Sequence, residues 1–447
     1  MIKLKNVVFL PLNKRFYNNI KYMSDETIRI AVAGNVDSGK STLAGVLLND
    51  CLDDGRGYCR SLILRNKHER DTGRTSCISF NNFYKEKEGG RKIISLIDLA
   101  GHEKYLKTTM SGITGLFVDY GLVLVAANMG ITKMTKEHIG LLLFLKVPII
   151  ILVTKIDMVP EQLKHATIRK LKKIANLPVF NKKAYTFPEN EEKCENEMID
   201  FSKLNDPLDT FIPIINISNK TGQNISNLKN LLFSLDSREH WSETIDGSIV
   251  YVDSKYTVKG IGLVLSGTVR GKSIKQNQKL YIGPINEKFI PFKVRSLHNN
   301  MRENIDEAVN NEICCIAIRF TGKETLTKKQ VPRGVIIVDS EKLQKNICRR
   351  FKAEITILSH STTISNNYQP VIHCGLVRQA ARIKIIESIG KENSNKMKLR
   401  TGNKAIVEFI FSFKSEYIEK GTTFFFRDGN TKGYGTVLEV CPNKIEI

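Results

Sequence analysis

The sequence predicts an α/β domain, built on a mostly parallel sheet with helices on both faces, followed by two all-β barrel domains. Three observations predict this fold class. From Thr27 to about Leu235 apolar strands alternate with helical patterns, which is the order that builds a parallel sheet. After Ser237 the helical period largely disappears, and short alternating strands replace it. Near the start, a glycine-containing loop between a strand and a helix marks a ligand-binding edge of the sheet.

This loop runs from Gly34 to Ser41, after the apolar run Ile28 to Ala33. Such a loop curls its backbone N–H groups around phosphate oxygens, and the next helix points its positive end at them. Lys40 would neutralise phosphate charge, and the Ser41 hydroxyl would hold Mg²⁺. The alternative is an ordinary glycine turn, against which the flanking strand and helix argue. The expected phosphate-binding residues are Asn35, Val36, Asp37, Ser38, Gly39, Lys40, Ser41 and Thr42.

Length, charge and cysteine content narrow the class of protein. A chain of 447 residues is long enough for about two to four domains. Its net charge of +22 favours polyanionic partners such as RNA, although a compositional bias toward Lys, Asn and Ile would also produce it.

The nine cysteines form no C-x-x-C pair, so neither a zinc site nor a disulfide framework is expected. The run Val7 to Leu12 is too short for a signal peptide and no run approaches a membrane span, which predicts a cytoplasmic protein with no membrane partner.

The first domain has four further predicted strands and a closing helix. The strands are expected at Lys92 to Ile97, Leu122 to Ala127, Ile149 to Val153 and Ile214 to Ile217. The closing helix presents one apolar face, made of Ile225, Leu228, Leu231, Leu232 and Leu235. Ligands of parallel sheets bind at the carboxyl ends of the strands, and each remaining motif falls at such an end.

The motif that follows the strand Lys92 to Ile97 carries the expected chemistry. Asp98 is placed to reach the Mg²⁺ shell, and the Gly101 N–H can bond a γ-phosphate because only glycine lets the backbone come that close. His102 follows, within reach of a water in line with that phosphate. A single His is more often structural than catalytic, but its position beside this motif makes it the candidate catalytic residue.

Two motifs predict recognition of guanine, which favours GTP over ATP. Asp157 can accept hydrogen bonds from guanine N1–H and from its 2-amino group, and adenine offers neither in that geometry. Thr154 stands where an Asn is usual, so one contact to the base or to the loop is expected to be weaker. Ser218-Asn219-Lys220 follows the last strand and is placed to contact guanine O6. The expected guanine-binding residues are Thr154, Lys155, Asp157, Ser218, Asn219 and Lys220.

Two segments between the motifs are expected to be irregular. Gly55 to Thr75 is basic and contains glycine, which predicts a mobile switch or, alternatively, a solvated charged loop. Within it, Thr75 is the candidate to hold Mg²⁺ in the triphosphate state. Asn181 to Asp209 is predicted to be an exposed acidic insertion, and a solvated loop is favoured there over a partner site. The expected metal ligands are Ser41, Thr75 and Asp98.

The second half of the chain predicts two β-barrels. Strands of the first are expected at Ser248 to Val252, Leu263 to Val269, Gln278 to Ile282, Phe292 to Leu297, Ile313 to Phe320 and Val335 to Val338. Lys342 to Phe351 is predicted to link the barrels. The second barrel begins with Phe351, Ala353, Ile355 and Ile357 in alternation and continues at Val371 to Ile386, Ala405 to Phe413, Thr422 to Arg427 and Thr436 to Val440. The expected domains are a short extension at 1–25, the nucleotide domain at 26–238, with its acidic insertion at about 181–209, and barrels at 245–345 and 350–447.

The motifs, in this order, resemble the translational GTPases of the elongation factor Tu and elongation factor 1-alpha type, and most of all the subgroup called GTP-binding protein 1-like. The resemblance rests on Ala33 to Leu47, Gly55-Arg56-Gly57, Lys67-His68-Glu69, Gly73-Arg74-Thr75, Asp98 to Tyr105, Thr154 to Met158 and Phe426-Arg427-Asp428-Gly429. That subgroup also has Thr at the base motif and Ala before the Gly-His pair. Arg74 differs from the Ile that elongation factor Tu carries before its switch threonine.

The resemblance implies a P-loop GTPase domain and a monomeric factor that hydrolyses GTP to GDP and phosphate. It also implies aminoacyl-tRNA and the ribosome as partners in the GTP state. The other class considered is a GTP-regulated RNA-binding or mRNA-decay adaptor, which would act with the RNA-decay machinery and hydrolyse GTP only incidentally. Basic residues of the second barrel are expected to contact RNA or, equally, to form a solvated surface: Lys352, Arg378, Arg382, Lys384, Lys396, Lys398, Arg400 and Lys404.

Overall fold

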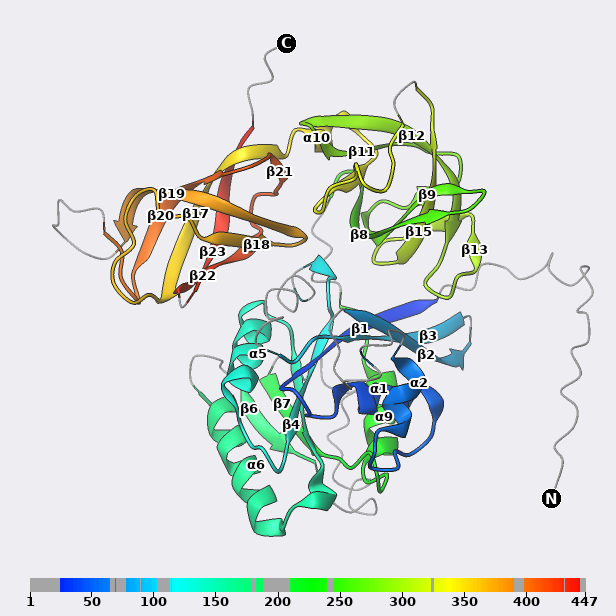
Figure 1. The fold of residues 1–447 in the computed structure, drawn as a ribbon, viewed down its shortest axis with the longest axis vertical. Helices are drawn as coiled ribbons and strands as arrows, with labels where there is room; N and C mark the ends of the chain where they lie inside the picture. The colour runs from blue at the N-terminus through cyan, green and yellow to red at the C-terminus, as the bar shows by residue number, and fades with distance from the viewer. Residues whose placement is uncertain are drawn as a thin grey trace, which may run out of the picture.

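A computed structural model describes residues 25–64, 69, 78–88, 90–102, 113, 115–177, 182–187, 210–238, 245–322, 325–389, 398–429 and 431–442. They form an α/β body with two β bodies above it in Figure 1. The α/β body comprises β1 (Glu26–Gly34), α1 (Lys40–Asn49), α2 (Tyr58–Ile63), β2 (Ser79–Lys87), β3 (Gly90–Asp98), β4 (Tyr120–Ala126), α5 (Lys133–Phe144), β5 (Ile149–Thr154), η3 (Ile156–Met158), α6 (Glu161–Ala175), β6 (Lys183–Thr186), β7 (Phe211–Asn216) and α9 (Ile225–Ser234).

The sheet of the α/β body has the strand order β2-β3-β1-β4-β5-β7-β6. All neighbours pair in parallel except β2 and β3, which pair antiparallel. Helices α5 and α6 bury one face of the sheet, and α1 and α9 bury the other. Because both faces are covered, the central strands β4 and β5 are buried along their whole length, which explains their continuous apolar sequences. In the described part of the chain, no helix combines the length and apolarity needed to cross a membrane.

The second body is a closed β-barrel. It contains β8 (Ser248–Val258), β9 (Gly262–Gly271), β10 (Ile274–Lys275), β11 (Lys279–Ile285), β12 (Lys288–His298), β13 (Asn304–Ile305), β14 (Glu307–Ala308), β15 (Ile313–Phe320) and β16 (Ile336–Val338). The order is β11-β16-β8-β9-β15-β12-β13, and pairing of β11 with β12 closes the barrel. Strand alternation points one face of each strand into a single apolar core.

The third body is also a closed barrel, reached through α10 (Glu341–Gln344). It contains β17 (Ile347–Ser359), β18 (Val371–Cys374), β19 (Val377–Ile389), β20 (Lys404–Phe411), β21 (Glu416–Tyr417), β22 (Thr423–Asp428) and β23 (Thr431–Pro442). Strands β20 and β17 pair to close the order β20-β19-β18-β22-β23-β17. Phe351 stacks on Phe409 at 5.2 Å between ring centroids, inside the core.

The fold corrects three expectations about segments. Within Asn181 to Asp209, expected to be an exposed insertion, residues 183–186 form β6 at the edge of the sheet and Phe187 is buried, because the strand pairs with β7. Residues 188–209, which hold the acidic side chains, lie outside the described residues. The expected single strand Val371 to Ile386 is a hairpin of β18 and β19 that turns at Gly375, whose φ of 53° suits glycine. The expected link Lys342 to Phe351 contains most of α10 and already enters β17 at Ile347.

Two further differences lie in the α/β body. The start of the expected switch, Gly55 to Thr75, is helical because α2 packs on α1, while residues 65–68 and 70–77 lie outside the described residues. Packing is close there: a Cβ on Gly45 of α1 would lie 2.2 Å from the Cys59 carbonyl oxygen of α2. Strand β2 was not expected, and it adds an antiparallel edge beside β3.

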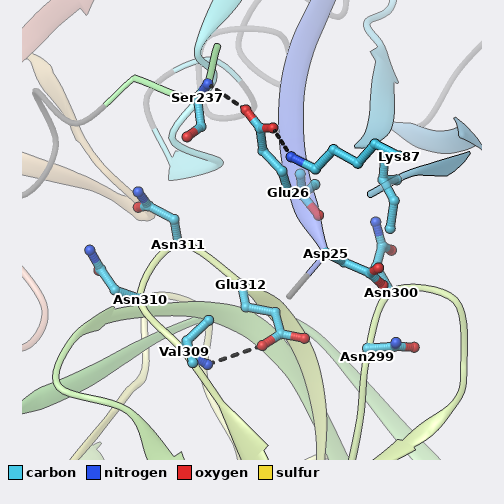
Figure 2. A pocket seen from close by; sticks show the side chains of 12 residues that line it. Asp25, Glu26, Lys87, Ser237, Asn299, Asn300, Val309, Asn310, Asn311 and Glu312 are labelled. Atoms are coloured by element: carbon cyan, nitrogen blue, oxygen red, sulfur yellow. Dashed lines mark hydrogen bonds and ion pairs between the residues drawn. The ribbon is translucent and has the colours of Figure 1, made fainter. Parts of the chain in front are cut away.

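A cavity of about 310 Å³ lies between the α/β body and the second body (Figure 2). Asp25, Glu26 and Lys87 line it from the first body, and Asn311 and Glu312 face them from the second. Glu26 accepts hydrogen bonds from Lys87 at 2.6 Å and from the Ser237 backbone at 3.3 Å. The cavity lies where β1 begins, so it is separate from the carboxyl edge of the sheet.

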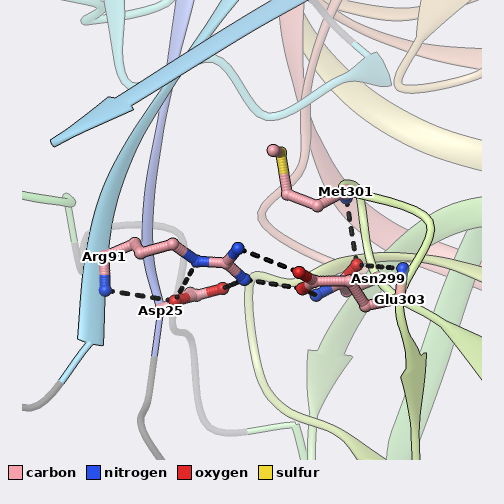
Figure 3. Close-up of polar contacts among 5 residues, drawn as sticks. All are labelled: Asp25, Arg91, Asn299, Met301 and Glu303. Carbon is pink, nitrogen blue, oxygen red and sulfur yellow. Dashed lines mark hydrogen bonds and ion pairs between the residues drawn. The ribbon is translucent and has the colours of Figure 1, made fainter. Parts of the chain in front are cut away.

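Beside this cavity, Arg91 bridges the two bodies (Figure 3). Its guanidinium donates to Asp25 at 2.6 and 3.1 Å and to Glu303 of the second body at 2.6 and 3.0 Å. The hydrogen bonds from Arg91 lower the pKa of Glu303 to about 2. A second contact, deeper in the interface, is made by the buried Arg29, which donates to Thr268 at 3.2 Å. Two arginines of the α/β body, Arg91 and Arg29, therefore donate hydrogen bonds across this interface.

The third body meets the other two through different chemistry. Phe144 of α5 packs against Phe425 and Tyr434, with ring centroids 4.5 and 4.1 Å apart, and Lys432 pairs with Glu137. Between the barrels, the Ser415 hydroxyl donates to Glu287 at 2.9 Å, and Lys414 donates to the Arg333 carbonyl oxygen at 2.9 Å.

Glu416, at the junction of the barrels, makes the stability of the protein depend on pH. It is buried beside Gly334 and accepts hydrogen bonds from Gln379 at 2.9 Å and Lys414 at 3.1 Å. Burial raises the pKa of Glu416 to about 7. As the pH rises above the ordinary carboxyl value, the unfolded chain ionises first, so this group lowers the free energy of unfolding progressively until the pH passes about 7.

We expect Glu416→Gln to raise the free energy of unfolding at pH 8 by about 1 to 3 kcal/mol relative to the parent, and to change it little at pH 4.5. Thermal or denaturant unfolding across this pH range measures the difference. Glu439→Gln is the matched control, because Glu439 is an exposed carboxylate of the same barrel, paired with Lys352, and its pKa is lowered by that partner. An equal pH dependence in parent and Glu416→Gln would contradict the role given to Glu416.

Candidate functional site

The candidate site lies at the carboxyl edge of the first sheet. Strands β1, β3, β5 and β7 run in parallel, so the segments that follow them leave at this one edge. Those segments are residues 34–41, 98–102, 154–157 and 218–220. The sheet therefore brings together four motifs that are far apart in the sequence.

The loop between β1 and α1 requires glycine at both ends. Gly34 has a φ of 151°, and a Cβ there would lie 2.5 Å from the Leu124 carbonyl oxygen. Gly39 has a φ of 87° and directly precedes α1. Because α1 begins here, its positive end faces the loop, and Gly39 has no side-chain oxygen that would occupy the first N–H groups. Ser38 is buried in the loop, whereas Asp37 is exposed.

Lys40 fixes the centre of the loop. Its side chain is only 7% exposed, and its ammonium donates to the carbonyl oxygens of Asn35 at 2.7 Å and Gly34 at 3.2 Å. Burial lowers the pKa of Lys40, while the nearby Asp98 carboxylate acts in the opposite direction. The loop therefore wraps around a buried cation, an arrangement suited to an anionic ligand.

Ser41 and Asp98 come together from two elements. The Ser41 hydroxyl, in the first turn of α1, donates to the Asp98 carboxylate at the end of β3 at 2.7 Å. Asp98 is 1% exposed. A hydroxyl and a carboxylate are the hard oxygen donors that Mg²⁺ prefers, so this pair fits that metal. Thr75, the third expected metal ligand, lies outside the described residues.

The backbone after Asp98 passes close to the loop. A Cβ on Gly101 would lie 2.4 Å from the Lys40 ammonium nitrogen and 2.7 Å from the Gly34 carbonyl oxygen. Only glycine fits at this position, because any side chain would occupy the space beside the buried cation. His102 is the next residue and is exposed.

The base-motif residues are linked to the loop and to each other. The buried Thr154 hydroxyl donates to the Ser38 carbonyl oxygen at 2.8 Å. Thr154 was expected to weaken one contact, and the structure shows that its shorter side chain still bonds the loop. Ser218, also buried, donates its hydroxyl proton to the exposed Asp157 carboxylate at 2.7 Å. The same Ser218 oxygen accepts from the Thr221 backbone N–H at 3.1 Å, so it orders the 218–221 turn around Asp157.

Sequence reasoning missed a segment that supports this turn. The Asp53 backbone N–H donates to the Asn219 carbonyl oxygen at 2.9 Å, and a Cβ on Gly55 would lie 3.5 Å from the Lys220 side chain. Two aspartates before a glycine and a short helix could have suggested the local turn, since Asp53 and Asp54 accept from the backbone N–H groups at the start of α2. Its contact with Asn219 depends on the tertiary fold, and no sequence pattern indicates it.

The fold and this edge define a protein with a P-loop nucleotide-binding domain followed by two β-barrels. A family model described as the elongation factor Tu GTP binding domain matches residues 25–238. A model described as the elongation factor Tu C-terminal domain matches residues 345–441. The chain therefore belongs to the elongation factor Tu family of translational GTPases, the family that its motifs resemble.

Individual proteins show the same similarity. GTP-binding protein 1 of Xenopus laevis is 37% identical over 435 residues, and the match covers 92% of this chain and 63% of that protein. GTP-binding protein 2 of Homo sapiens is 34% identical over 440 residues, covering 92% of this chain and 69% of that protein. Translation elongation factor SelB from Methanococcus maripaludis, solved in complex with the GTP analogue GppNHp, is similar in fold, with a TM-score of 0.67 at 22% identity. That match covers 94% of this chain and 81% of the SelB chain.

Proposed function

We propose that this protein binds GTP at the carboxyl edge of the first sheet and hydrolyses it to GDP and phosphate as a translation factor that binds RNA. The observation that carries the proposal is the Ser218–Asp157 hydrogen bond, which orients a carboxylate at the same edge as the Lys40 loop. A phosphate-binding loop alone would suit many nucleotides. A carboxylate held beside it, with both oxygens able to accept, suits guanine.

The phosphate-binding role is proposed for the loop residues Asn35 to Thr42 and for Gly101. Lys40 and the first N–H groups of α1 supply positive charge, and the close approach of Gly101 lets its N–H reach the same phosphate. Ser41, Asp98 and Thr75 are the proposed metal-holding residues. Bound Mg²⁺ would supply charge neutralisation at the phosphate oxygens.

Guanine recognition is proposed for Asp157, supported by its neighbours. Asp157 accepts from guanine N1–H and the 2-amino group, and Ser218 keeps the carboxylate in place. Asn219 and Lys220 present their backbone to O6, while Thr154 ties the base motif to the loop. Lys155, whose φ of 57° turns the backbone sharply after β5, completes the proposed site.

The catalytic role is proposed for His102. It follows Gly101 directly, so its side chain starts beside the loop, and it is exposed at the edge of the site. From this position it can orient a water for in-line attack on the terminal phosphate. The proposed chemistry is therefore positioning and charge neutralisation by the chain's own groups.

RNA binding is supported by a basic cavity of about 390 Å³ on the outer face of the third body. Arg350, Arg382 and Lys384 line it, and Arg382 and Arg350 lie on either side of Ile410 in neighbouring strands. Within the described residues, none of these three cations lies within salt-bridge distance of a carboxylate. Lys352, grouped with them on sequence grounds, instead pairs with Glu439 at 2.8 Å.

Three cations that have no carboxylate partner among the described residues, beside two asparagine side chains, suit the phosphate backbone of RNA. We propose aminoacyl-tRNA and the ribosome as the partners, a cytoplasmic location and a monomeric state. In this proposal residues 26–238 act as the GTPase domain, and the barrels at 245–345 and 350–447 complete the RNA-binding face.

Asp157→Asn tests the guanine assignment. The carboxamide donates where the carboxylate could only accept, so we expect GTP affinity to fall by roughly a hundredfold or more and preference to shift toward xanthosine nucleotides. Titration with fluorescent GDP and XDP measures both. Undiminished affinity of the variant for GDP would contradict the assignment of Asp157.

His102→Ala tests the chemistry separately from binding. We expect nucleotide affinity close to that of the parent and partner-stimulated hydrolysis lower by roughly a hundredfold, because the imidazole acts mainly in the transition state. Phosphate release in the presence of ribosomes measures turnover. Equal rates in parent and variant would mean that another group orients the water.

The RNA proposal predicts a dependence on both nucleotide and salt. Aminoacyl-tRNA is expected to bind tightly with a GTP analogue and weakly with GDP, with affinity falling in log–log terms by roughly 0.7 to 0.9 per phosphate neutralised. The double variant Arg350→Glu and Arg382→Glu should weaken binding and lower the salt slope. Lys170→Glu with Lys173→Glu is the control, because it removes the same charge from exposed positions on α6.

Filter binding of charged and uncharged tRNA with each nucleotide gives these affinities. If both double variants weakened tRNA binding equally, the binding would depend on the overall charge of the protein and not on the cavity of the third body. Equal affinity with GTP analogue and GDP would contradict the switch, and capture of mRNA or nucleases in place of tRNA would favour a decay adaptor.

A further inference from the structure

Two cysteine thiols meet beside the base-recognition turn. The sulfur atoms of Cys51, just after α1, and Cys59, in α2, lie 3.2 Å apart. The Cys59 thiol also lies 3.4 Å from the Cys51 carbonyl oxygen. The spacing of eight residues fits no short cysteine motif, so spacing alone does not predict this pair.

The segment between the cysteines, residues 51–59, holds the thiols together. The two oxygens of the buried Asp53 carboxylate accept from the backbone N–H groups of Cys59 and Gly55, each at 3.0 Å. Gly45 provides the space for α2, because a Cβ there would overlap the Cys59 backbone. Bond formation requires the sulfurs to move about 1 Å closer to reach the length of a disulfide bond.

The same segment bonds the proposed guanine-binding turn at one point and passes close to it at two more. Asp53 N–H bonds the Asn219 carbonyl oxygen at 2.9 Å. The Leu52 side chain lies 3.3 Å from the Cβ position of Gly222, and the Lys220 side chain lies 3.5 Å from that of Gly55. A cross-link across residues 51–59 would therefore stiffen the support of the turn.

We propose that Cys51 and Cys59 are a thiol-oxidation site, which a peroxide closes to a disulfide and a cellular thiol reopens, and that the closed form slows release of guanine nucleotide. The disulfide itself does not depend on nucleotide binding. Its effect on release rests on the proposed function, because it requires the 218–222 turn to contact guanine.

The oxidation proceeds in two balanced steps. Cys51 is partly exposed, and its thiolate attacks hydrogen peroxide, giving a sulfenic acid and, with one proton, water. The Cys59 sulfur then displaces the hydroxyl group, forms the S–S bond, and its proton leaves with that group as a second water. Burial raises the pKa of Cys59 to about 12, which keeps it a thiol and assigns the first attack to Cys51. Two exchange reactions with a small thiol reverse the step and release that thiol as its own disulfide.

The test uses the full chain, treated with hydrogen peroxide and then with dithiothreitol. Peptide mapping of the alkylated protein should find a Cys51–Cys59 cross-link after peroxide, with the loss of two hydrogen atoms, and none after reduction. Release of fluorescent GDP should slow by about three- to tenfold in the oxidised protein, since part of the lost chain freedom stabilises the turn. Dithiothreitol should restore the original rate.

Each variant is compared with itself before and after oxidation. Cys51→Ser and Cys51→Ala should lose the response to peroxide, whereas Cys441→Ser, which removes a partly exposed thiol from the third body, should keep it. Absence of the cross-linked peptide would overturn the site, and a cross-link without a change in GDP release would overturn its coupling to the turn. Failure of the reduced protein to bind GDP would contradict both the proposed function and the effect of the disulfide on nucleotide release. The peptide map would still show whether the disulfide forms.

Discussion

The close approach of Gly101 to Lys40 is the contact on which the rest of the site depends. Strands β1 and β3 are parallel neighbours, so the loop after one and the turn after the other must share the same space. A Cβ on Gly101 would lie 2.4 Å from the Lys40 nitrogen, and that nitrogen already bonds two loop carbonyl oxygens. Any side chain at Gly101 would push apart the cation and the backbone that form the proposed phosphate site.

The residues of the proposed guanine site are held in place by buried hydroxyl groups. Thr154 bonds the loop carbonyl of Ser38, and Ser218 bonds Asp157 while it orders its own turn. Both hydroxyls are buried, so water competes little for these bonds. The exposed Asp157 therefore takes its orientation from residues that need not touch a ligand, and Asp53 extends this support outward by bonding Asn219.

Much of the fold, and the placement of the four motifs at one edge of the first sheet, could be predicted, and the failures have physical causes. The expected strand from Ile149 was recognised because a strand covered on both faces is apolar throughout, whereas β6 is a short edge strand beside an acidic run and lacks that signal. The hairpin of β18 and β19 was merged into one strand because apolar residues continue up to both sides of Gly375. The Thr154 bond and the Cys51–Cys59 contact depend on which elements pack together, and spacing in the sequence carries no information on that.

The interfaces between the bodies differ in their chemistry. The α/β body contacts the second body both through charged groups, such as Arg91 between Asp25 and Glu303, and through the aromatic pair of Phe117 and Tyr251. It contacts the third body through Phe144, which packs against Phe425 and Tyr434. Charge pairs cost desolvation energy that offsets much of their attraction, so the Arg91 pairs fix the relative position of the two bodies more than they add net stability. The proposed GTP-dependent RNA-binding face requires the α/β body to shift relative to the barrels, and the free energy for that shift must come from a difference in nucleotide affinity between the two arrangements.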